Sequence, residues 1–166
     1  MIPKNYAQLF TSEECDIIIS YVENKNNWTR VDVDGQSRFN LIGLELDWVS
    51  NRFIDYIKKV ENINVSDSKF VRCLKYNIGD FFEPHKDFQP NLDFYKTFMY
   101  NINILLNDDF KGGDFIVSNQ VYPKQRGWAY YYSSNEIHEV RKVTDGVRYS
   151  ILYGVFSDTI VKNKLI

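Results

Sequence analysis

Two stretches in the first third of the chain place apolar residues at helical spacing. Apolar side chains recur every three or four positions within residues 12–23 and 47–60, which puts them on one face of an α-helix. Thr11 and Glu14 have the spacing of a capping box, and Asp47 is the expected N-cap of the second helix. The residues expected to face the core are Cys15, Ile18, Ile19, Val22, Val49, Phe53, Ile54 and Ile57. We predict two helices that brace a sheet and carry no chemistry.

From residue 69 onward the pattern changes to short alternating or wholly apolar runs, which are typical of β-strands. Asn, Asp, Gly and Pro residues separate these runs and indicate turns. Strands are predicted at residues 70–76, 81–83, 97–106, 115–117, 121–122, 128–132, 139–141 and 147–156, after two earlier strands at 28–33 and 39–44. This pattern predicts a mainly β, α+β fold with antiparallel pairing in a sandwich or barrel, as a single domain over residues 1–166.

Composition and charge narrow the class of protein. The chain is 44% hydrophobic and 16% aromatic, with 12 Tyr and 12 Phe, a composition that favours sheet. A formal net charge of −2 argues against a broad nucleic-acid-binding surface. No apolar run resembles a signal peptide or is long enough to span a bilayer, so we expect a soluble, intracellular protein without a membrane partner. Cys15 and Cys73 are too few for a disulfide framework and are expected to be reduced.

The two histidines of the chain are the candidates for metal chemistry. His85 and Asp87 are two positions apart, so in an extended segment their side chains point the same way from Cα atoms roughly 6.5 Å apart. His138, from another predicted strand, would complete the two-histidine, one-carboxylate set that binds non-haem iron. The His85–Asp87 pair alone is weak support, because such short spacings arise by chance. The second histidine, and Arg148 ten positions beyond it, strengthen the metal prediction.

These residues belong to a longer series of motifs between residues 76 and 156. The series comprises Tyr76, Gly79, His85, Asp87, Leu106-Asn107-Asp108, Gly112-Gly113, Pro123, Gly127, Ala129 and His138. In order and spacing it resembles the catalytic core of the Fe(II)- and 2-oxoglutarate-dependent dioxygenases, most closely the prolyl 4-hydroxylase branch. The resemblance implies a double-stranded β-helix, or jelly roll, with the N-terminal helices packed on one sheet.

The resemblance also implies cofactors and roles for individual residues. His85, Asp87 and His138 would be the catalytic iron ligands. 2-Oxoglutarate would chelate the iron and extend its distal carboxylate to Arg148, whose planar guanidinium suits a carboxylate, with a further hydrogen bond from the Tyr76 hydroxyl. The cofactors expected are therefore Fe(II), 2-oxoglutarate and O₂, with ascorbate as reductant.

The expected substrate is proline in a peptide or protein, as in a procollagen-proline 4-dioxygenase. Two departures from that branch concern the substrate: Arg148 stands where collagen-type enzymes often have lysine, and Phe98 where a peptide-binding arginine is common. A lysyl or free amino acid hydroxylase on the same scaffold is the alternative, and a non-catalytic jelly-roll binding module is the alternative from another class. The seven-residue separation of Arg141 and Arg148 does not match the arginine pair of nucleic-acid demethylases.

Two features near the predicted site allow more than one interpretation. Asn101 and Asn103 share one face of a strand and either line the pocket or hydrogen bond within the sheet. The segment 88–96 is either a loop that closes over the site or an ordinary surface connection. Phe88, Tyr95 and Trp128 are candidate aromatic contacts for a substrate.

Overall fold

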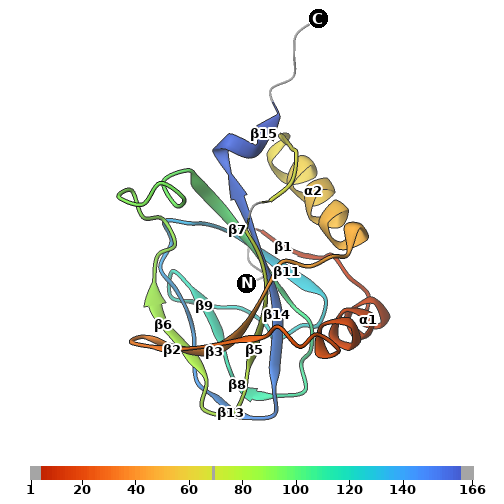
Figure 1. Ribbon diagram of the computed structural model, residues 1–166, viewed down its shortest axis with the longest axis vertical. Helices are drawn as coiled ribbons and strands as arrows, with labels where there is room; N and C mark the ends of the chain where they lie inside the picture. The colour runs from red at the N-terminus through yellow and green to blue at the C-terminus, as the bar shows by residue number, and fades with distance from the viewer. Residues whose placement is uncertain (1–4, 69, 162–166) are drawn as a thin grey trace, which may run out of the picture.

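The computed structural model describes residues 5–68 and 70–161 and is dominated by β-strands (Figure 1). Two helices, α1 (Ser12–Glu23) and α2 (Asp47–Glu61), and a short 3-10 helix, Ser157–Thr159, accompany the strands. The strands are β1 (Tyr6–Gln8), β2 (Thr29–Val33), β3 (Gln36–Ile42), β4 (Asn64–Val65), β5 (Val71–Tyr76), β6 (Phe81–His85), β7 (Phe98–Leu105), β8 (Lys111–Gly112), β9 (Phe115–Val117), β10 (Gln120–Val121), β11 (Trp128–Ser133), β12 (His138–Val140), β13 (Val143–Asp145), β14 (Arg148–Phe156) and β15 (Ile160–Val161). Among these residues, no helix is both long enough and apolar enough to span a bilayer.

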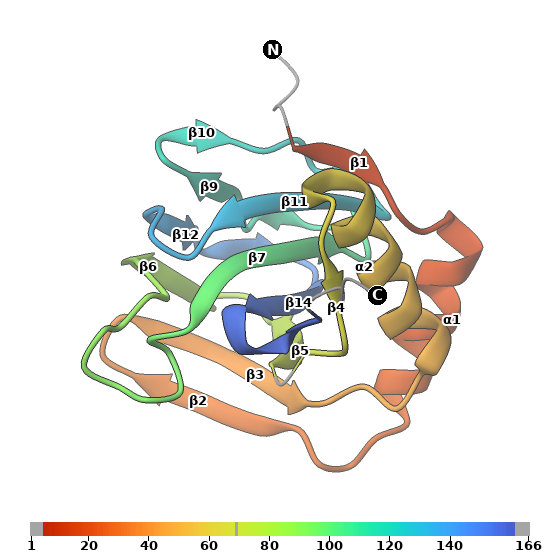
Figure 2. The same ribbon diagram turned by 90° about the horizontal axis from the view of Figure 1, so that it is seen from above.

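Eleven of the strands form one curled antiparallel sheet. Its strand order is β1-β11-β7-β14-β5-β3-β6-β12-β9-β10, and β2 pairs with β3 at its margin. The sheet curls so far that Phe115 of β9 packs on Tyr130 and Tyr132 of β11, although β9 and β11 are far apart in the strand order. The result is the predicted jelly roll (Figure 2).

Both helices cover the outer face of β7, β14 and β5, on the side away from β6 and β9 (Figures 1 and 2). Buried residues of α1, α2 and these strands form one apolar cluster, in which the rings of Phe53 and Tyr153 stack at 4.6 Å. Thr11 and Glu14 form the predicted capping box of α1. The bracing role predicted for the two helices is therefore confirmed.

Several predicted details are corrected by the structure. The N-cap of α2 is Leu46 rather than Asp47, and no side chain caps this end. The strand predicted to begin at residue 39 begins at Gln36, and β2 is largely exposed because it pairs only with β3. The strands β1, β4, β8, β13 and β15, each of two or three residues, were not predicted.

Candidate metal centre and the cavity beside it

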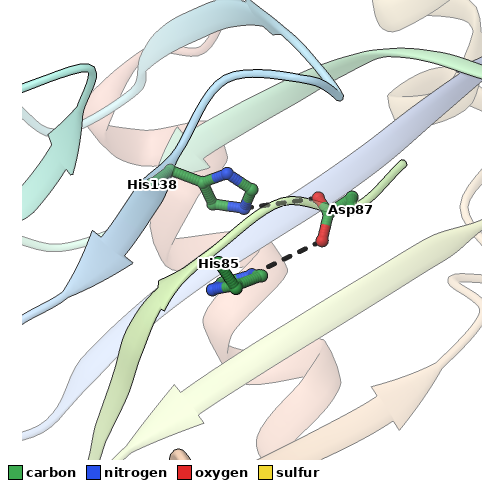
Figure 3. A group of neighbouring side chains, drawn as sticks. All are labelled: His85, Asp87 and His138. Atoms are coloured by element: carbon green, nitrogen blue, oxygen red, sulfur yellow. Dashed lines mark ion pairs between the residues drawn. The ribbon is translucent and has the colours of Figure 1, made fainter. Parts of the chain in front are cut away.

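Two of the three candidate metal ligands lie on strands that run side by side, and the third follows one of these strands (Figure 3). His85 is the last residue of β6, His138 is the first residue of β12, and the two are directly paired. Asp87 follows β6, where its backbone N–H donates to the Ser134 carbonyl at 3.1 Å. The Nε2 atoms of His85 and His138 lie 3.4 and 3.3 Å from the two carboxylate oxygens of Asp87, and the ligand atoms are all within 4.8 Å of one another.

Backbone carbonyls orient both imidazoles. His85 Nδ1 lies 2.7 Å from the Glu83 carbonyl oxygen, and His138 Nδ1 lies 3.0 Å from that of Glu136. Because a carbonyl oxygen only accepts, each Nδ1 carries the proton and each Nε2 is left with a free lone pair. Both lone pairs are therefore available to a metal ion bound between the two imidazoles and Asp87.

Asp87 is held as a carboxylate anion between the imidazoles. Burial alone would raise its pKa, but when the imidazoles are protonated, hydrogen bonds and charge from His138 and His85 outweigh burial and hold the pKa well below its usual range. Asn101 Nδ2 donates a further hydrogen bond to Oδ2 at 2.8 Å. Asn101 thus supports the candidate ligand, a role that neither of the two interpretations of this residue had included.

A cavity of about 330 Å³ opens beside the three residues. Besides His85, Asp87 and His138, its lining includes Gln36, Arg38, Tyr76, Phe82, Tyr95, Asn103 and Tyr132. Two nitrogen donors and one carboxylate oxygen, with the cavity on their open side, match the coordination preference of non-haem Fe(II). The residues present therefore fit an iron ion with room for a cosubstrate.

Arg148 lies next to Tyr76 and is almost completely buried, with 1% of its surface exposed. Its Cζ is 5.3 Å from the centre of the Tyr76 ring, and its Nη1 donates to Ser150 Oγ at 2.9 Å. Burial lowers its pKa, yet no carboxylate of the described residues forms an ion pair with it, and its Nε has no hydrogen-bond partner there. A buried cation without a counter-ion is costly, so this environment suits an anionic ligand.

The double glycine identified in the sequence makes room for Arg148. Gly113 has φ +62°, and a Cβ atom there would lie 3.1 Å from Arg148 Cδ. Gly112 has φ +66°, and a Cβ atom there would lie only 2.3 Å from the Lys142 carbonyl oxygen. Any side chain at these positions would therefore displace Arg148 or the adjoining strand.

Sequence reasoning missed Arg38 as a residue of the cavity. Its Nη1 donates to the Tyr76 hydroxyl at 3.1 Å, so Tyr76 contacts both arginines. The available signal was the alternation of polar Gln36, Arg38 and Asn40 with other residues along one strand, but the predicted strand began too late to include it.

The three aromatic residues proposed as substrate contacts have different positions. Tyr95 lines the cavity. Phe88 lies beside a separate depression of about 240 Å³, and Trp128 packs on Tyr6 with ring centroids 4.6 Å apart. Of the three, only Tyr95 remains a candidate for substrate contact.

The chain matches the family model described as the 2OG-Fe(II) oxygenase superfamily over residues 71–153. This match includes Tyr76, all three candidate metal ligands and Arg148. No curated protein sequence matches the chain.

Many solved structures share the fold. A prolyl-4-hydroxylase from Pseudomonas putida superposes with a TM-score of 0.73 at 13% identity, covering 90% of this chain and 91% of that one. A prolyl hydroxylase from Trichoplax adhaerens, in complex with a hypoxia inducible factor peptide, gives 0.70 at 16% identity over 92% and 83% of the chains. The non-heme alpha-ketoglutarate-dependent epimerase SnoN from nogalamycin biosynthesis gives 0.69 at 11% identity over 90% and 76%. At these identities the likeness establishes the fold and leaves the substrate open.

Proposed function

Since the chain belongs to the 2OG-Fe(II) oxygenase superfamily, we propose that it hydroxylates proline in a peptide or protein. The family uses Fe(II), 2-oxoglutarate and O₂. The observation that carries the proposal is the convergence of His85, Asp87 and His138, with both Nε2 lone pairs free, at the wall of an open cavity.

Each part of the site has a distinct task in this proposal. When bound, iron and 2-oxoglutarate supply, with O₂, the oxidising power that converts a C–H bond into C–OH and releases succinate and CO₂. His85, Asp87 and His138 hold the metal, and Asn101 fixes the carboxylate through its hydrogen bond. Arg148 binds the distal carboxylate of 2-oxoglutarate, because it is the buried cation without a counter-ion beside Tyr76.

Two of the three solved structures described above are prolyl hydroxylases, which supports proline as the proposed substrate. The cavity lining includes the exposed residues Lys86 and Gln89, so a peptide segment has access to it. A second candidate, hydroxylation of a free amino acid, is favoured by Arg38, a cation within the cavity that the metal and 2-oxoglutarate do not require.

Substitution of the candidate ligands tests the proposed chemistry. His85→Ala and His138→Ala should reduce 2-oxoglutarate-dependent succinate formation to background while the circular dichroism spectrum stays that of a folded protein. Ile137→Ala is the matched control, because Ile137 precedes His138 and is exposed. Succinate formation unchanged in either histidine variant would remove that residue from the metal site.

Product analysis tests the proposed substrate. Proline-rich and lysine-containing peptides would be incubated with Fe(II), ascorbate and 2-oxoglutarate and analysed by mass spectrometry. The expected result is a mass increase of one oxygen atom located on proline. Oxygen located only on lysine, or only on a nucleobase in a parallel incubation, would contradict the proline assignment but leave the oxygenase assignment intact.

A further inference from the structure

Arg38 is held close to the candidate metal centre by a stack of three planar groups. Its Cζ lies 4.2 Å from the centre of the Phe82 ring, and the Phe82 ring stacks on the His85 imidazole with centroids 3.6 Å apart. The stack and the hydrogen bond to the Tyr76 hydroxyl hold the guanidinium in place, with the Phe82 ring between it and the candidate ligand His85. An anion bound to Arg38 would therefore lie near the metal.

The charge of Arg38 is not balanced within the described protein. No carboxylate of the described residues forms an ion pair with it, and its buried Nε has no hydrogen-bond partner among them. Arg148 lies across the same tyrosine and is also without a carboxylate partner, so two guanidinium groups repel each other here. A protein tolerates such a like-charged pair at low cost when anions bind between or beside the two groups.

Binding of the cofactors would leave this charge in excess. A divalent iron, the dianion 2-oxoglutarate, Asp87 and Arg148 together have no net charge. Of the described residues that line the cavity, Asp87 is the one that is acidic. Arg38 and the exposed Lys86 therefore remain as cationic groups of the lining whose charge is not balanced. The part of the cavity around Arg38 is therefore positive and favours a negatively charged substrate.

We propose that Arg38 binds a carboxylate group of the substrate, so that the enzyme prefers substrates with a carboxylate close to the carbon that is hydroxylated. The inference rests on the proposed function and specifies its substrate class. Gln36, two residues before Arg38 on β3, also lines the cavity, and its buried Oε1 has no partner among the described residues. This oxygen is placed to accept an N–H group adjacent to the substrate carboxylate.

A carboxylate of this kind has three sources: the side chain of an acidic neighbour, a peptide C-terminus or a free amino acid. Three matched pairs of compounds distinguish them. The pairs are acetyl-Gly-Pro-Asp-amide with acetyl-Gly-Pro-Asn-amide, acetyl-Gly-Pro with its amide, and L-proline with L-prolinamide. Within each pair the compounds differ in one carboxylate.

The first measurement is binding to the Fe(II)- and 2-oxoglutarate-loaded protein by calorimetry without oxygen, so that it does not depend on turnover. In at least one pair, the carboxylate member should bind 10-fold or more tightly than its neutral partner. In Arg38→Met this preference should disappear, whereas Arg38→Lys should keep part of it because the charge remains. Arg72→Gln is the matched control, because Arg72 lies on the adjacent strand β5, stacks on Phe70 and does not line the cavity.

The second measurement is the requirement for 2-oxoglutarate, which Arg38→Met should leave within about threefold of the wild-type value. A change in the 2-oxoglutarate requirement as large as the change in substrate binding would assign Arg38 to the cosubstrate and overturn the inference. Equal or undetectable binding of both members of all three pairs would also overturn it, as would a preference that persists in Arg38→Met. Failure of the proposed function is distinguishable, because it appears as absence of succinate formation in the wild-type protein with every compound.

Discussion

The two faces of the strands β5, β7 and β14 differ sharply in composition although their residues alternate along the same backbone. On β7, Ile102 and Ile104 face the helices, while Asn103 lines the cavity and Asn101 donates a hydrogen bond to Asp87. On β14, Ile151 belongs to the apolar cluster beneath the helices, whereas the adjacent Ser150 accepts a hydrogen bond from Arg148. The helix-facing side is apolar, whereas the cavity-facing side combines polar residues with apolar ones such as Leu74 and Leu152.

Most of the buried polar atoms that lack a partner among the described residues belong to the cavity-facing side or to β3 beside it. They include the Oδ1 atoms of Asn101 and Asn103 and the Nε atoms of Arg38 and Arg148. Each such atom costs about 1–3 kcal/mol of stability when nothing bonds to it. We infer that the helix-facing side stabilises the fold and the cavity-facing side is shaped for ligands, so substitutions on the two sides should have different consequences.

The largest expected effect on stability comes from the helix-facing side. Ile104→Ala should lower the free energy of unfolding by about 2–5 kcal/mol, because Ile104 is completely buried and its truncation leaves a cavity. Urea denaturation measures this loss, and the activity per folded molecule should not change. Ile104→Val, which removes one methylene group, is the control and should cost about 0.5–1.5 kcal/mol. A complete loss of activity in a folded Ile104→Ala protein would contradict the separation of the two faces.

Arg148, on the cavity-facing side, should give the opposite result. Arg148→Gln should raise the 2-oxoglutarate requirement about 100-fold, or ~2.7 kcal/mol, because a buried charge pair with the cosubstrate is lost. The unfolding free energy without ligands should stay the same or rise, since the variant no longer buries an unpaired cation. Steady-state kinetics and denaturation measure the two quantities, with Arg148→Lys as the variant that retains charge. Equal losses of bound metal and 2-oxoglutarate affinity would contradict the proposed role.

A smaller effect is expected from the residue that supports Asp87. Asn101→Ala should weaken Fe(II) binding about 10- to 100-fold, the usual effect of removing a hydrogen bond to a metal ligand. Competitive metal titration without oxygen measures the affinity. Asn103→Ala is the matched control, because Asn103 lies on the same face of β7 but, among the described residues, the β7 hydrogen bond to Asp87 comes from Asn101. If Asn101→Ala binds Fe(II) as tightly as Asn103→Ala does, the Asn101 hydrogen bond has no positioning role.

Local sequence features predicted much of this arrangement. The capping box of Thr11 and Glu14 and the spacing of His85 and Asp87 involve residues only two or three positions apart, so the backbone geometry of one element decides their relationship. The strand alternation likewise separated the two faces of β7. The jelly roll itself was inferred from the resemblance of ordered motifs, because the number of strands alone left both a sandwich and a barrel open.

Features that depend on distant pairing were not predictable in the same way. Arg38 reaches the cavity because β3 pairs with β5 and thereby places it opposite Tyr76, a register that neither strand reveals alone. Asn101 had two equally good interpretations until the fold brought Asp87 within hydrogen-bond distance. Both residues therefore owe their proposed roles to contacts between distant segments.

The smallest expected effect lies among the helices and involves Arg52 of α2. Its guanidinium donates to both carboxylate oxygens of Glu14 at 2.9 and 3.2 Å and to the Leu9 carbonyl at 2.6 Å, which ties α2 to the start of α1. Because the pair is partly exposed, Arg52→Met should lower the unfolding free energy by only about 0.5–1 kcal/mol. Methionine is chosen because its side chain still covers Phe10 and Trp48, on which Arg52 packs.

The pH dependence of that loss separates the ion pair from the packing. The hydrogen bond from Arg52 lowers the pKa of Glu14 below its ordinary value of 4.5, with burial opposing and the Thr11 backbone adding to the effect. A carboxyl group whose pKa is lower in the folded protein stabilises it above the unfolded-state pKa and loses that contribution as the pH falls through the folded-state pKa. The difference in unfolding free energy between wild type and Arg52→Met should thus be full at pH 7 and shrink below pH 4.5. A difference of the same size at pH 3 would mean that contacts other than the Glu14 pair, such as the bond to Leu9, account for the contribution of Arg52.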